Sequence, residues 1–166
     1  MTSDTPASTA RVRHALGAFE LAANHHRRDV RRRLRVGEDE LTVLLHLAHH
    51  GGASQRHLTG VTSLSRSGAG ALLQRLEERG YVQRRTDPAD RRLRLVELSP
   101  AGRERLDGAY AGLIAAIAAL VAERDPAEVA GFAELLTGIA RAIEPEGERR
   151  LAVVTDATDP IWRRWG

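Results

Sequence analysis

The stretch from Ser54 to Leu98 constrains the fold more than any other part of this 166-residue chain. It contains two short helical patterns, and a serine stands at the start of each, Ser54 and Ser65. Serine is favoured at helix N-caps because its hydroxyl accepts a hydrogen bond from a backbone N–H that has no partner in the helix. Only a few residues separate the two patterns, and Gly80 is well placed to end the second. Two short helices with a tight connection are typical of a helix-turn-helix.

The hydrophobic period changes after Gly80. Residues 81–86 and 93–98 are rich in aromatic, β-branched and leucine residues, which favours strands. The polar segment 87–92 between them contains Pro88, placed as in a type I turn. We therefore predict a β-hairpin with a charged tip, in which the adjacent apolar residues Leu95 and Val96 interrupt the alternation. A hairpin directly after a helix-turn-helix defines a winged helix, whose parts suit the grooves of duplex DNA.

Longer helices are predicted on both sides of this region. The first extends from about Ser8 to Arg35 and is expected to end at Gly37, and a second covers 39–50 before two glycines. Ser99 and Pro100 suit the cap and first position of a helix whose apolar stripe covers 106–121. A last helix begins at Asp125-Pro126 and ends near Ile143. The expected fold class is mainly α with a small β-hairpin wing: a winged helix-turn-helix plus a helical dimerisation region.

The apolar stripes of the outer helices exceed what a small winged helix can cover, which predicts a homodimer. The expected segments are a flexible N-terminus at 1–10, an N-terminal dimerisation helix at 11–36, the winged helix-turn-helix at 37–99, C-terminal dimerisation helices at 100–143, and a tail of unknown role at 144–166. The tail holds both tryptophans and is interpreted as a strap that packs on the domain or its partner. The expected dimer contacts are Val12, Leu16, Phe19, Leu113, Ile117, Leu120, Phe132, Leu136 and Ile139.

Composition and charge exclude several classes of function. The chain has no cysteine, so it contains no disulfide, thiolate zinc site or cysteine nucleophile. Residues 1–10 lack the apolar core of a signal peptide, and the nearly apolar run 111–122 is too short to span a bilayer, so a cytoplasmic protein without membrane association is expected. No catalytic arrangement or phosphate-binding glycine loop is found, so we expect neither an enzyme nor a cofactor.

The charge is distributed unevenly along the chain. Residues 51–94 contain nine arginines against four acidic residues, a net charge of +5. Residues 95–166 contain eight arginines against twelve acidic residues, a net charge of −4. A basic middle region fits a domain that meets a polyanion such as DNA.

Residues 64–102, LSRSGAGALLQRLEERGYVQRRTDPADRRLRLVELSPAG, resemble the core signature of the MarR-type regulators. The most specific part is the segment Asp87–Arg92, followed by an apolar strand and the helix start Leu98–Gly102. The helix order over 8–143 is also similar. The resemblance implies a homodimer formed by the first and the last two helices, binding to a pseudo-palindromic DNA operator, and repression that a small-molecule effector usually releases.

The predicted recognition helix buries the face with Ala69, Leu72, Leu73 and Leu76. The outward positions are Arg66, Ser67, Gly70, Ala71, Gln74 and Arg75. The resemblance places Ser65, Arg66, Ser67, Gly70, Ala71 and Gln74 at the major groove, and Ser54 and Arg56 near the DNA backbone. It also makes Arg92 the arginine that enters the minor groove and Asp90 the residue that holds the tip, with Arg91 as a backbone contact.

Gly70 departs from the family pattern, since relatives often have a hydroxyl residue there. It indicates either close approach of the helix backbone to DNA or sequence drift in a helix held by its packing.

Two questions remain open at the level of sequence. His46, His49 and His50 share one helix, and His57 follows shortly. Their spacing suits a zinc site, but no cysteine supports it, so we predict histidines of a helix surface or ligand cleft and no metal. The preferred function is a sequence-specific DNA-binding transcriptional regulator, which is expected to be a dimeric repressor released by a small-molecule ligand. The alternative is a winged-helix architectural or protein-interaction module without a ligand response.

Overall fold

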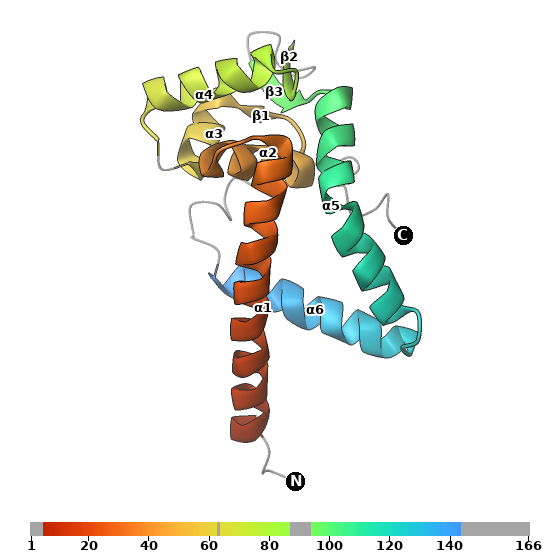
Figure 1. The fold of residues 1–166 in the computed structure, drawn as a ribbon. Helices are drawn as coiled ribbons and strands as arrows, with labels where there is room; N and C mark the ends of the chain where they lie inside the picture. Colours follow the sequence, from red (N-terminus) through yellow and green to blue (C-terminus); the bar gives the residue numbers. More distant parts are fainter. Residues whose placement is uncertain (1–4, 63, 87–93, 144–166) are drawn as a thin grey trace. The chain divides into compact units, whose positions relative to one another are not determined.

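The structure, a computed structural model, describes residues 5–62, 64–86 and 94–143. The elements in chain order are α1 (Thr5–Leu34), α2 (Glu38–His50), β1 (Ala53–Ser54), α3 (Gln55–Val61), α4 (Arg66–Glu78), β2 (Val82–Thr86), β3 (Arg94–Leu98), α5 (Pro100–Val121) and α6 (Pro126–Ile143) (Figure 1). Helix α1 belongs to one compact unit, and the elements from α2 onward belong to a second. The predicted fold class, mainly α with a small winged region, is confirmed.

Helix α1 differs from its prediction at both ends. It begins at Thr5, within the segment 1–10 for which a flexible N-terminus was predicted. It ends before Arg35, which has a left-handed φ of 54°, whereas Gly37 was expected to end it. The N–H groups of Arg35 and Val36 bond to the carbonyls of Arg32 and Arg31 at 3.3 and 3.1 Å, so the chain turns two residues earlier than expected.

The helix boundaries of the winged region follow the predicted caps. The hydroxyls of Ser54, Ser65 and Ser99 accept the N–H groups of His57, Gly68 and Gly102 at 3.2, 3.2 and 2.8 Å. Gly80, with φ 71°, ends α4: its N–H bonds to the Glu77 carbonyl, and the next N–H bonds to the Leu76 carbonyl. Only a residue that tolerates this left-handed conformation suits that position, as predicted for Gly80.

The sheet has three antiparallel strands in the order β1-β3-β2. The sequence analysis predicted a hairpin of two strands and missed β1, whose Ala53 pairs with Val96 of β3. A two-residue strand leaves no periodic pattern to detect. Strand β1 also explains the adjacent apolar residues of β3: Val96 is buried, while half-buried Leu95 packs beside Gly52, where an added Cβ would lie 3.6 Å from the Leu95 Cβ.

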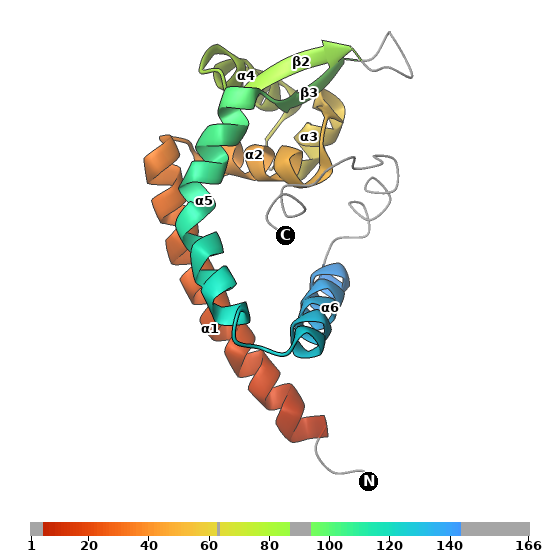
Figure 2. The same cartoon turned by 90° about the vertical axis from the view of Figure 1, so that its right-hand side faces the viewer.

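The core of the winged region lies between α2, α3, α4 and the sheet. Figure 2 shows β2 and β3 side by side next to α4, with α5 following β3. The side chains that are almost fully buried here include Leu41, Leu44, Leu47, Leu58, Leu72, Leu73, Leu76 and Leu106. These leucines recur at helical spacing along their elements, so their burial fixes which face of α4 points outward.

Candidate nucleic-acid interface

Helix α4 presents opposite faces to the core and to solvent. Ala69, Leu72, Leu73 and Leu76 are buried, as predicted. Arg66, Ser67, Ala71, Gln74 and Arg75 are exposed. The structure thus brings most of the predicted recognition residues onto one accessible face, and Arg56 of α3 is exposed as well.

The beginning of α4 gathers hydrogen-bond donors. Ser65 caps the helix, and its Oγ lies 3.0 Å from the Oγ of Ser67. Arg66 is exposed between these two serines. The first N–H groups of a helix carry a partial positive charge, and an arginine beside them adds a full one. This end of α4 can therefore bind an anionic group such as a phosphate.

Gly70 lies where α3 approaches α4. A Cβ added at this position would stand 3.2 Å from Nε2 of Gln55, tighter than an ordinary contact. A larger residue at position 70 would require the end of the Gln55 side chain to shift by a few tenths of an ångström, so this contact favours a small residue there without requiring one. Gln55 itself was not singled out by the sequence.

Arg75 has a partner that the sequence did not indicate. Its Nε donates to Oε1 of Glu40 at 3.3 Å, and Nη1 of Arg79 lies 3.5 Å from Oε2 of the same carboxylate. Glu40 is only 8% exposed and also accepts the N–H of Gly37 at 2.9 Å. The prediction that Arg75 simply faces outward misses this ion pair, although its side chain remains 55% exposed. Glu40 therefore ties the second half of α4 to the start of α2.

The described part of the wing is held by ion pairs. Nε of Arg84 donates to Glu77 of α4 at 2.9 Å, and Nε of Arg85 donates to Glu97 across the strand pair at 2.8 Å. Burial works to raise the pKa of Glu97, but hydrogen bonds from Gln83 and Arg85 and the charge of Arg85 together lower it. The wing-tip residues Asp90, Arg91 and Arg92 lie outside the described residues.

Four of the histidines, those of α2 and α3, lie close together where α2 ends and α3 begins. Nε2 of His46 lies 2.7 Å from Nε2 of His57, and the rings of His46 and His50 are 4.5 Å apart. Burial, followed by the charges of His50, His57 and His49, lowers the pKa of His46 to about 4. Within the ranges that the structure describes, no three or more His, Asp or Glu side chains are arranged to hold a metal ion.

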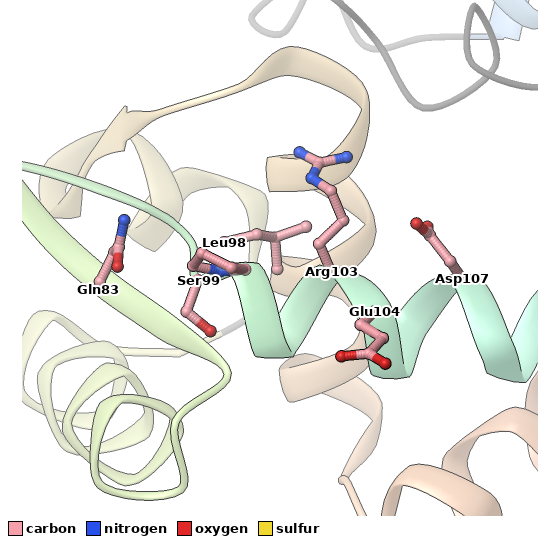
Figure 3. Close-up of a pocket in the computed structure, with 7 residues that line it drawn as sticks. Gln83, Leu98, Ser99, Arg103, Glu104 and Asp107 are labelled. Atoms are coloured by element: carbon pink, nitrogen blue, oxygen red, sulfur yellow. The ribbon is translucent and has the colours of Figure 1, made fainter.

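A pocket of about 550 Å³ lies at the junction of the wing and α5, lined by Gln83, Leu98, Ser99, Pro100, Arg103, Glu104 and Asp107 (Figure 3). Arg103 and Asp107 extend from the same side of α5, and Glu104 points the other way. Nη1 of Arg103 and Oδ1 of Asp107 are buried and have no hydrogen-bond partner among the described residues. No feature of the sequence indicates this pocket, because residues from two strands and a helix form its walls once these elements pack together.

The outer helices carry large apolar side chains on their surfaces. Of the predicted dimer contacts, Phe19, Leu120 and Phe132 are 57%, 70% and 66% exposed. Val12, Leu113, Ile117 and Leu136 are also exposed, and Leu16 and Ile139 are half-buried. In the parts that the structure describes, no helix is both long and apolar enough to cross a membrane.

A helix-turn-helix of α3 and α4 followed by a β2–β3 wing places this chain among the winged helix-turn-helix proteins. Residues 23–93 match the family model described as MarR family. The match covers less than half of the chain, and residues 64–93 of the predicted resemblance lie within it, so the resemblance to this family is confirmed. Relatives whose names state a role, such as one that matches this chain in sequence and one that matches it in fold, are called transcriptional regulators.

Individual proteins resemble this chain in sequence or in fold. The uncharacterized HTH-type transcriptional regulator YdgJ of Bacillus subtilis (strain 168) is 33% identical over 72 residues, which cover 43% of this chain and 44% of that protein. The chain therefore aligns with less than half of the length of this curated relative. A MarR family protein from Bacillus stearothermophilus has a similar fold, with a TM-score of 0.63 at 16% identity, over 85% of this chain and 99% of that one. RV1404 from Mycobacterium tuberculosis gives a TM-score of 0.60 at 21% identity, over 87% and 98%.

Proposed function

We propose that this chain is a dimeric, sequence-specific regulator of transcription that binds double-stranded DNA and acts as a repressor released by a small-molecule ligand. Residues 37–99 form the DNA-binding part, and 11–36 with 100–143 form the dimerisation part. One observation carries the proposal: α4 buries an apolar face and exposes arginine, serine and glutamine side chains on the other. This arrangement is the one a helix needs to enter the major groove.

The exposed face of α4 supplies both kinds of contact that operator binding requires. Arg66 suits the O6 and N7 atoms of guanine, and Gln74 suits adenine once its amide leaves Oε1 of Glu78, 2.9 Å away. Ser65 and Ser67 bind phosphate at the start of the helix. We assign the remaining contacts to Ser54, Arg56, Gly70, Ala71, Asp90, Arg91 and Arg92. Because Arg75 is paired with Glu40, we assign it a contact through its exposed part only.

Dimerisation is supported by the exposed apolar residues of α1, α5 and α6. Side chains such as Ile117, Leu120 and Phe132 expose half or more of their surface. Contiguous exposed apolar surface is typical of association sites, and within α5 the exposed Leu113, Ile117 and Leu120 recur at spacings of four and three, on one face of the helix. A second copy of the chain is the partner that also supplies the twofold symmetry of a pseudo-palindromic operator.

Ligand release is supported by the pocket beside the wing. Because Arg103 and Asp107 each have a buried polar atom without a described partner, a small molecule with an acceptor and a donor group would satisfy both. We place the effector there. A cytoplasmic location follows from the proposed action on DNA.

The test is a fluorescence-anisotropy titration with the intergenic DNA upstream of the gene and with scrambled DNA of equal length. Wild type should bind the intergenic DNA more tightly, with an affinity that falls steeply as salt rises. Arg66→Ala should lose about 1–3 kcal/mol on the intergenic DNA and much less on scrambled DNA.

The matched control is Arg141→Ala, which removes the same charge from an exposed position of α6. It should bind both DNAs as wild type does. Equal losses of affinity for the two variants would show that Arg66 contributes only its positive charge and makes no base-specific contact. Equal affinity of wild type for both DNAs would refute sequence-specific regulation and favour the architectural module.

A further inference from the structure

Two histidines from different helices face each other in the winged region. His46 lies on α2 and His57 on α3, eleven residues later, and their Nε2 atoms are 2.7 Å apart. His50 lies one turn beyond His46, with ring centroids 4.5 Å apart, and His49 meets the His50 ring edge-on at 4.7 Å. Four imidazole rings therefore lie close together, and the Nε2 atoms of His46 and His57 meet among them.

The local structure holds this pair in place. The hydroxyl of Ser54 accepts the N–H of His57, which anchors the first turn of α3. Ser54 itself pairs with Leu95 of β3, so the start of α3 is tied to the sheet. Helix α2 is fixed by buried leucines on both sides of His46, Leu44 and Leu47. The two rings therefore face each other because both backbones are held.

The donor atoms at this point suit a transition-metal ion. The rings that lie against His46 are those of His50 and His57, with centroids 4.5 and 4.7 Å away. A neutral imidazole offers a nitrogen lone pair to a metal. Such nitrogen surroundings suit zinc, copper or nickel and do not suit magnesium or calcium.

We propose that His46 and His57 form a binding site for a divalent transition-metal ion of the Zn²⁺ type that bridges α2 and α3. The protein supplies two ligands, and water completes the coordination shell. Tetrahedral Zn²⁺ with Zn–N bonds of 2.0–2.1 Å separates two nitrogens by about 3.3 Å. The two Nε2 atoms must therefore move apart by about 0.6 Å, which small rotations of the rings provide. This site depends only on the fold and not on DNA binding.

The experiment uses the full chain without a histidine tag, stripped of metal with EDTA and dialysed. Isothermal titration calorimetry with ZnCl₂ at pH 7.5 should show one saturable site per protomer, and MgCl₂ should show none. His46→Gln and His57→Gln should each weaken Zn²⁺ binding at least about tenfold, because even loss of a residue that only supports a ligand costs about 10–100-fold. His25→Gln, at an exposed position of α1, is the matched control and should bind as wild type does. Circular dichroism checks that each metal-free variant is folded.

A measurement on the wild type needs no variant. In NMR spectra of the imidazole rings, Zn²⁺ should shift the resonances of His46 and His57 and leave exposed His14 of α1 unchanged. Absence of saturable binding and of ring shifts would overturn the proposal and leave the pair as a hydrogen bond only. Wild-type-like binding by His57→Gln, together with loss in His50→Gln, would also overturn it, because the ion would then be held within α2.

Discussion

Replacing Gly102 with alanine should destabilise the winged region strongly. Gly102 lies in the first turn of α5, and a Cβ at this position would stand 2.0 Å from the carbonyl oxygen of Tyr81 and 2.9 Å from its Cα. These are backbone atoms, so no side chain can rotate away. The same carbonyl accepts the N–H of Ser99 at 3.0 Å, and the Ser99 hydroxyl donates to the Gly80 carbonyl at 2.6 Å. The alanine methyl group must therefore push α5 away from the start of β2.

The magnitude follows from these contacts. Adding volume to a close-packed site costs about 1–3 kcal/mol. Separating α5 from β2 also weakens two hydrogen bonds, each worth about 1 kcal/mol. We expect a loss of about 2–5 kcal/mol in the free energy of unfolding, a large part of the stability of a typical domain.

The assay is urea denaturation followed by circular dichroism, at one fixed protomer concentration because association affects apparent stability. Gly108→Ala is the matched control, since a Cβ at Gly108 of the same helix meets nothing within 4 Å. This control should gain up to about 1 kcal/mol from the higher helix propensity of alanine. A Gly102→Ala midpoint equal to that of wild type would refute the close approach of α5 to Tyr81.

Three further predictions address the site and the assembly. The pKa of His46 is lowered from 6.5 to about 4 in the folded chain. Between these two pH values the unfolded chain therefore binds a proton at His46 that the folded chain does not bind. Stability should therefore be full above pH 6.5 and fall by about 1–2 kcal/mol toward pH 4, a loss reduced by solvent at this half-exposed ring. Metal-free His46→Gln should lose this part of the pH dependence in urea titrations. Glu40→Gln should lower stability by about 1–3 kcal/mol because Arg75 and Arg79 lose a charged acceptor, whereas exposed Glu104→Gln should not. Ile117→Asp should convert the proposed dimer to monomer in sedimentation velocity and weaken operator binding with it, and a wild type that stays monomeric at micromolar concentration would contradict the dimer.

Much of the fold could be predicted from the sequence because it depends on neighbours along the chain. Ser54, Ser65 and Ser99 begin helices through hydrogen bonds to N–H groups three residues later, and Gly80 ends one through its own left-handed φ. The leucine spacing of α4 identified its buried face, and therefore its exposed face. For the site, this local information predicted which side chains are accessible, but not what they contact within the protein.

The remaining features come from residues that only the folded chain brings together. The positions of the caps and of the apolar faces follow from the sequence, since these interactions span three or four residues. The tertiary structure alone decided that Glu40 binds Arg75, 35 residues away, and that His46 meets His57. It also decided that a two-residue strand joins the sheet and that the Gly102 position has no room for a Cβ. The physical reason is that such contacts depend on the distance between packed elements, and the spacing of residue types along the chain does not indicate that distance.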